Sequence, residues 1–200
     1  MLALAERLLG HLEVADVPRL ARPFAARHID DWSTCDWYCV KVLGPFVERV
    51  PDRRAAAEAV AAWRAAESLW QRRAAAVAFA NLARRGDEVF DGLTDLVLEV
   101  CASNVRDPAR FSQTGVGWVL RELSRASPDA VAHFVSAHRD AMSREAIRSA
   151  TSKLPAAQGR NRPASRTTAN AKTSTVRRAA RRPTHSARPP TEDGPTTEPR

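Results

Sequence analysis

The chain has 200 residues, enough for one sizeable domain or for a domain and a tail, and 44% of them are hydrophobic. Its formal net charge is +8. No segment approaches the roughly 18 uninterrupted apolar residues of a membrane span, and charged side chains interrupt the apolar N-terminus, which excludes a signal peptide. The three cysteines form no CxxC pair, so we expect reduced, buried thiols, no metal site and a cytoplasmic protein.

The positive charge is concentrated at the C-terminal end. Residues 155–200 hold ten Arg or Lys against three acidic residues, with seven of the 13 prolines and no aromatic residue. This composition is typical of a disordered basic tail. Removing these residues from the totals of 31 basic and 23 acidic leaves 21 and 20 in residues 1–154, which are nearly neutral. Binding by this part must therefore depend on a local arrangement of charges.

Residues 1–154 show helical periodicity with short breaks and no strand pattern. Residues that favour helix N-termini mark several starts, such as Ser143 before an amphipathic segment. Gly44-Pro45 is a candidate break within one long helix. The predicted helices cover residues 2–13, 17–28, 31–50, 53–66, 68–85, 87–103, 109–126, 128–139 and 143–153.

The predicted helix 31–50 is apolar nearly all round and should be mostly buried. Asp36 lies in its most apolar arc, four residues after Trp32. A lone buried carboxylate costs roughly several kcal/mol unless it is paired. Asp36 is therefore either a structural residue that bonds a helix terminus or an arginine, or a functional carboxylate.

The predicted helix 68–85 has its core stripe centred on residues such as Phe79 and Leu82. Arg73 lies about 180° from Leu82 among small residues, so its cation should reach out over a shallow surface. Such a cation suits a phosphate, although an ordinary solvated arginine explains it equally well. Arg72 lies on another face and looks ordinary.

An internal repeat relates the predicted helix 68–85 to the predicted helix 109–126. A shift of 41 residues lays residues 70–84 over residues 111–125, with Trp70 on Phe111 and Arg84 on Arg125. Antiparallel helix pairs that recur at roughly 40–47 residues are typical of HEAT repeats. We therefore predict an all-α HEAT-like helical repeat solenoid over residues 1–154, whose equivalent helices line a concave surface.

The predicted helix 109–126 carries a tryptophan on its polar face. Trp118 points away from the core stripe around Val116 and Leu120, toward Arg121. An exposed indole on this side suggests a ligand. Two mid-helix glycines, at about 1 kcal/mol each relative to Ala, indicate close helix packing and would also clear space beside the indole. These are Gly115 and Gly117.

These residues place two indoles, one carboxylate and one guanidinium on successive helices. Hydrolysis of an ordinary glycoside needs two carboxylates, one of them to protonate the leaving group. A purine alkylated at N3 or N7 is already cationic, so its departure needs no general acid. One anionic Asp can stabilise the developing charge on the sugar and orient water, while indole faces attract the cationic base.

Four motifs carry a family resemblance: IDDWSTCDWYCVKVLG from residue 29, LWQRRAAAVAF from residue 69, RFSQTGVGWVLREL from residue 110 and MSREAIR from residue 142. They resemble those of the bacterial HEAT-like alkylpurine DNA glycosylases, the AlkD-type DNA alkylation repair family.

The resemblance implies a role for each of the unusual residues. Asp36 would be the catalytic carboxylate, Trp32 and Trp118 would embrace the lesion, and Arg73 would contact a phosphate. Arg121, beside Trp118, is the second predicted DNA-binding residue. The expected substrate is double-stranded DNA with N3- or N7-alkylated purines, excised without base extrusion by a monomer in the nucleoid that needs neither metal nor cofactor.

The motif resemblance covers residues 29–153 and leaves two segments outside it. Family members usually carry further repeats before the WxxxD motif, whereas 28 residues precede it here, so either the start is set too late or this is a shortened member with weak activity. The basic tail is either a non-specific DNA tether or a dispensable extension. Two alternative functions stay open: a non-catalytic DNA-binding HEAT module, and a protein-interaction scaffold in which Asp36 is structural.

Overall fold

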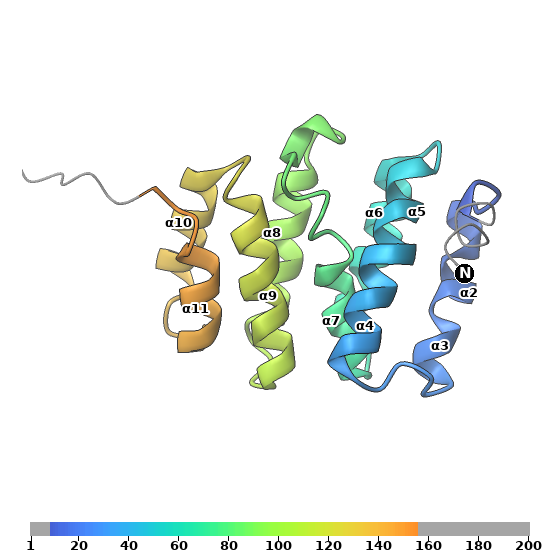
Figure 1. Cartoon of the computed structure of the whole chain (residues 1–200), viewed down its shortest axis with the longest axis horizontal. Coiled ribbons are helices and arrows are strands. Elements are labelled where there is room, and N and C mark those ends of the chain that lie inside the picture. The colour runs from blue at the N-terminus through green and yellow to red at the C-terminus, as the bar shows by residue number, and fades with distance from the viewer. Residues whose placement is uncertain (1–8, 156–200) are drawn as a thin grey trace, which may run out of the picture. The chain divides into compact units, whose positions relative to one another are not determined.

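The computed structural model of the protein describes residues 9–155, and no strand occurs among them (Figure 1). The predicted tail and most of the predicted helix 2–13 lie outside the described residues, and the domain boundary at residue 154 stays a prediction. The α-helices are α2 (Val17–Leu20), α3 (Arg22–Ala25), α4 (Trp32–Tyr38), α5 (Gly44–Arg49), α6 (Arg53–Ala61), α7 (Leu69–Val77), α8 (Leu93–Asn104), α9 (Arg110–Leu123), α10 (Pro128–Ala137) and α11 (Arg144–Thr151).

The helices from α4 onward form two layers (Figure 1). One layer contains α4, α7, α9 and α11, in which α7 packs between α4 and α9, and α11 packs on α9. The second layer contains α6, α8 and α10, which alternate along the chain with the helices of the first layer. This arrangement of successive antiparallel helix pairs confirms the predicted all-α helical repeat fold.

The predicted 41-residue repeat is visible in side-chain positions. Trp70 on α7 and Phe111 on α9 pack against each other, with ring centroids 5.1 Å apart and ring planes tilted by 43°. Two residues further on, Arg72 and Gln113 are also equivalent, and each ties its repeat to the next. The inter-repeat contacts therefore come from corresponding positions of the repeat.

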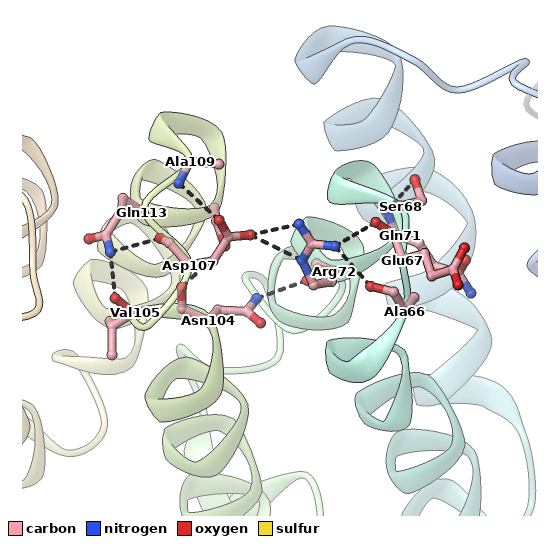
Figure 2. Close-up of polar contacts among 11 residues, drawn as sticks. Ala66, Glu67, Ser68, Gln71, Arg72, Asn104, Val105, Asp107, Ala109 and Gln113 are labelled. Carbon is pink, nitrogen blue, oxygen red and sulfur yellow. Dashed lines mark hydrogen bonds and ion pairs between the residues drawn. The ribbon is translucent and has the colours of Figure 1, made fainter.

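Arg72 forms the first of these ties (Figure 2). Its Nη1 donates to the carbonyls of Ala66 and Glu67 in the turn before α7, while its Nε and Nη2 donate to Asp107 Oδ2 at 3.0 and 2.8 Å. The side chain of Asn104 donates to the Arg72 carbonyl at 2.8 Å. Arg72, which looks ordinary in the sequence, therefore joins the turns before α7 and α9.

Gln113 joins two turns in the same way as Arg72, one repeat later, and this residue is 4% exposed. Its Nε2 donates to the Val105 and Asp107 carbonyls at 2.7 and 3.2 Å in the turn before α9 (Figure 2). Its Oε1 accepts from the backbone N–H of Ser143 at 2.9 Å, in the turn before α11. Ser143 is also the predicted N-cap of α11, accepting from the N–H of Ala146.

The predicted break at Gly44-Pro45 is instead a widened helical turn. Residues Cys39–Leu43 form a π-helix between α4 and α5, and the Gly44 N–H bonds the Cys39 carbonyl five residues back. Pro45 has no N–H, and its ring crowds the carbonyl of Lys41, so a wider turn lets the helix continue. Gly44 is needed because a Cβ there would lie 3.0 Å from the Ala78 carbonyl oxygen.

The end of α7 and the start of α8 differ most from the prediction. α7 ends at Val77, and residues 78–85 continue in tight turns, as shown by the Phe79 N–H bonding the Ala76 carbonyl. α8 begins at Leu93 rather than near residue 87, although Asp87 still caps it by accepting from the Thr94 N–H at 2.8 Å. The periodicity continues through these turns, so it gives no sign of where the hydrogen bonding changes.

The three cysteines are free and buried, as predicted. Cys35 and Cys39 direct their sulfurs toward carbonyls of α7, and burial raises the pKa of the Cys101 thiol to about 12. Among residues 9–155, no helix is long and apolar enough to cross a membrane. In the same range, no three His, Cys, Asp or Glu side chains gather in a way that could hold a metal ion.

Candidate functional site

α4 positions the first two residues of the site. Asp31 begins the helix, with its Oδ1 accepting from the N–H groups of Ser33 and Thr34 at 2.7 and 2.9 Å. Cys35 faces α7, so Trp32 and Asp36, one turn apart, share the adjacent side of the helix. Trp32 is 54% exposed, which is unusual for a large apolar side chain.

Asp36 is bound by Arg73 through two parallel hydrogen bonds. Arg73 Nε donates to Oδ1 and Nη2 to Oδ2, both at 2.8 Å. The side chain of Arg73 is 5% exposed and that of Asp36 is 16% exposed. Arg73 Nη1 also donates to the Phe111 carbonyl and to Thr114 Oγ1. One guanidinium on α7 therefore joins α4 to α9.

The exposed position predicted for Arg73 is wrong. Helix α7 packs against both α4 and α9, so every residue from Arg73 to Ala80 is buried, not just one stripe. The periodicity assumed one covered face, whereas a helix in the middle of a layer has two. The structural partner considered for Asp36 is an arginine, Arg73. The predicted contact between Arg73 and a DNA phosphate stays a prediction.

The two glycines of α9 make room for these neighbours. A Cβ at Gly115 would lie 3.1 Å from Nη1 of Arg73 and 3.3 Å from Val77. A Cβ at Gly117 would lie 2.8 Å from the Cα of Ala146 on α11. The predicted close packing is confirmed, while the space predicted beside Trp118 is occupied by Arg73 and by α11.

A cavity of about 320 Å³ lies along the first layer, near the N-terminal ends of α4, α9 and α11. Arg110 and Glu145 form an ion pair at 2.9 Å along its lining. Aromatic faces can hold a flat, cationic ring, and polar groups can orient it. The residues that line the cavity are Trp32, Arg73, Arg110, Phe111, Thr114 and Glu145.

The other two predicted site residues lie further along α9. Trp118 is half-buried, one turn beyond Thr114, and packs against the core without lining this cavity. Arg121 follows one turn later and binds Glu122 at 3.0 Å. The structure therefore joins Trp32, Asp36 and Arg73 in one site, and places Trp118 and Arg121 outside its cavity.

Sequence reasoning missed several of the lining residues. The repeat could have indicated Phe111 and Thr114, because the 41-residue shift lays them over Trp70 and Arg73. No comparable signal marks Arg110 and Glu145, two exposed charges that meet only because α9 and α11 are adjacent. The Arg110 hydrogen bond lowers the pKa of Glu145 and keeps this carboxyl ionised.

The fold and the site define a helical-repeat protein with a carboxylate–guanidinium pair beside an aromatic-lined cavity. The family model for DNA alkylation repair enzymes matches residues 3–154, about three-quarters of the chain. The chain therefore belongs to the DNA alkylation repair enzyme family, as its motifs predicted, and acts in DNA repair. This match also includes residues upstream of position 29, where the motif resemblance begins. Comparisons with curated proteins and with solved structures found no match.

Proposed function

We propose that the protein is a DNA glycosylase that hydrolyses the N-glycosidic bond of N3- or N7-alkylated purines in duplex DNA and leaves an abasic site. The observation that carries the proposal is the Asp36 carboxylate, fixed by Arg73 through two 2.8 Å hydrogen bonds beside the cavity of exposed Trp32. Its expected setting is the cytoplasm, as a monomer on DNA.

The chemistry needs one carboxylate. The alkylated purine carries a positive charge, so cleavage of its bond to C1′ releases a neutral base and leaves positive charge on the sugar. The Asp36 carboxylate stabilises that charge, and water adds to C1′ and loses a proton to solvent. A charge that is already fixed in place when the transition state forms is most effective, and Arg73 provides this fixation.

The aromatic residues contribute to binding. Trp32 presents an exposed indole, which attracts a cationic purine more strongly than a neutral one. Phe111 adds a second ring to the cavity, held against Trp70. Trp118 and Arg121, on the same face of α9 as Thr114, extend the proposed contact surface toward the flanking DNA.

A non-catalytic DNA-binding module is the alternative that one observation favours. Both oxygens of Asp36 already accept from Arg73, and that ion pair, which joins α4 to α7, is by itself a sufficient structural reason for a partly buried carboxylate. In that case Asp36 would hold helices together, and the cavity would bind DNA without cleaving it.

The experiment is release of 7-methylguanine and 3-methyladenine from alkylated duplex DNA by the full chain and by Asp36→Asn. We expect release to fall by about 10²–10³-fold in the variant while duplex binding persists. The matched control is Asp30→Asn, which removes an exposed carboxylate from the segment before α4 and should leave release unchanged. Duplex binding without any release by the full chain would establish the binding module instead.

A further inference from the structure

The second notable charged site surrounds Glu122, near the C-terminal end of α9. The Glu122 side chain is 1% exposed, yet four basic side chains reach it. They come from three places: the segment after α7, the end of α9, and the segment after α11. The nitrogen–oxygen distances are 2.9 Å for Arg84, 3.0 Å for Arg121, 3.5 Å for Arg125 and 3.1 Å for Lys153.

This cluster is strongly unbalanced in charge. Glu122 supplies one negative charge to four cations, and within residues 9–155 none of the four pairs with another acidic residue. Burial raises the pKa of Glu122, but hydrogen bonds from Lys153 and Arg121 and the charge of Arg84 outweigh it, so the pKa lies below its ordinary value. The carboxylate is ionised at neutral pH, and three positive charges remain uncompensated.

The Glu122 carboxylate is shielded from solvent, whereas the four cations that surround it are accessible to solvent. Glu122 is inaccessible, whereas the four basic side chains are between 35% and 48% exposed. A buried anion that anchors several half-exposed cations holds them close together, which mutual repulsion would otherwise prevent. The result is a preformed positive surface with guanidinium forks, the geometry that matches phosphate oxygens.

We infer that Glu122 positions Arg84, Arg121, Arg125 and Lys153 as a binding site for the backbone phosphates of DNA, apart from the aromatic cavity. The inference rests on the proposed function for its ligand. Arg121 was predicted to bind DNA, but the other three cations and the organising role of Glu122 emerge only from the structure.

The cluster lies on the same face of α9 as the cavity. Thr114, which lines the cavity, and Arg121, in the cluster, are seven residues apart, two helical turns on one face. The helical rise makes this about 10 Å along the axis, close to the length of about three base pairs. One duplex can therefore contact the cavity and the cluster together.

A neighbouring ion pair provides the internal contrast. Arg85 follows Arg84 in the chain, is 46% exposed, and binds Glu48 at 2.7 Å. Arg84 is 43% exposed and binds Glu122 at 2.9 Å. The two arginines are matched in exposure and each forms one ion pair, but only Arg84 belongs to a cluster with surplus positive charge. Only Arg84 should therefore contribute to phosphate binding.

The test measures affinity for an undamaged duplex over a range of salt concentrations, using the full chain, Arg84→Ala with Arg125→Ala, and Arg85→Ala. We expect the double variant to lower the slope of log affinity against log salt by about two, with a loss on the order of tenfold per contact at low salt. Arg85→Ala should keep the parent slope.

Two outcomes would overturn the inference: an unchanged slope in the double variant, or an equal fall in Arg85→Ala. Both arginines are nearly half-exposed, so their truncation should leave the fold intact, as circular dichroism would show. Base release by the parent chain is measured separately. If the parent chain releases bases but the double variant keeps the parent salt slope, only the inference about the cluster is wrong. If the parent chain binds duplex DNA without releasing bases, only the proposed glycosylase activity is wrong.

Discussion

Asp36, which is partly buried, and Glu122, which is fully buried, are carboxylates in the same layer of helices, and they differ in how their charge is balanced. Asp36 has one partner, Arg73, which is itself buried, so the pair is neutral and closed. Glu122 has four partners, all partly exposed, so its cluster is positive and open. The same kind of ion pair therefore gives a closed, neutral pair between α4 and α7 and an open, positive surface near the C-terminal end of α9.

The difference shows that burial of a carboxylate does not by itself indicate its role. A single buried partner fixes the position of the carboxylate, which suits a group that must stabilise a developing charge. Several exposed partners make the carboxylate an anchor for cations, which suits binding of an anion. The number and exposure of the partners distinguish the two cases.

The largest effect on stability should come from Arg73→Met, which leaves the largely buried Asp36 carboxylate without its partner. We expect the free energy of unfolding, measured with urea, to fall by about 3–5 kcal/mol. Arg84→Met is the matched change at the other carboxylate. It should lower this free energy by only about 0–1 kcal/mol, because Arg84 is half-exposed and three cations remain on Glu122.

A double variant tests the cause of the first effect. Replacing both partners, with Asp36→Ala and Arg73→Met, removes the unpaired charge and should recover most of the lost free energy. If the double variant were no more stable than Arg73→Met alone, the loss would come from the packing of the arginine and the comparison would fail.

An intermediate effect is expected for Glu122→Gln, with a dependence on pH. At pH 7 the variant should lose about 1–2 kcal/mol of unfolding free energy, a figure reduced for the solvent exposure of the four cations. The folded-state pKa of Glu122 lies below its ordinary value of 4.5, so the unfolded chain takes up a proton more readily. The stabilisation is therefore present above pH 4.5 and lost as pH falls through the lowered value.

Urea unfolding from pH 7 down to below 4.5 measures this. The gap between the parent chain and Glu122→Gln should narrow as the parent carboxyl takes up its proton. A gap that stays constant over this range would show that Glu122 contributes through packing and not through its charge.

The smallest effect on stability is expected for Gly115→Ala. The gain of about 1 kcal/mol in helix propensity opposes the crowding of Arg73, whose Nη1 would lie 3.1 Å from the new Cβ. The unfolding free energy should change by less than about 1 kcal/mol, while base release falls about tenfold because the displaced guanidinium moves Asp36. Gly117→Ala, whose Cβ meets the α11 backbone at 2.8 Å, should instead lose stability.

Much of the fold was predictable from periodicity. The helical pattern placed the start of each first-layer helix within one residue, and the 41-residue repeat identified α7 and α9 as equivalent, in agreement with the contact between Trp70 and Phe111. Ser143 was predicted as the cap of α11 for a local reason, because a hydroxyl there reaches the N–H three residues on. Such features depend on a few consecutive residues.

The candidate site was only partly predictable. Asp36 stood out because a charge in an apolar arc is costly anywhere, and Trp32 because it lies one turn before it. The exposure of Arg73 was predicted wrongly, because the periodicity of one helix does not show how many other helices pack around it. The π-helix before Pro45 could not be predicted from the local sequence either, because a Gly-Pro pair within a helix is compatible with both a break and a π-bulge.

The sequence by itself determined the helical class, the repeat and the motifs that identify the family, because these depend on the order and spacing of residues along one chain. The tertiary structure decided which charges meet. Asp36 and Arg73 are 37 residues apart, and Lys153 lies 31 residues beyond Glu122. Each pair forms because side-by-side packing of α4, α7, α9 and α11 brings distant residues within hydrogen-bonding distance.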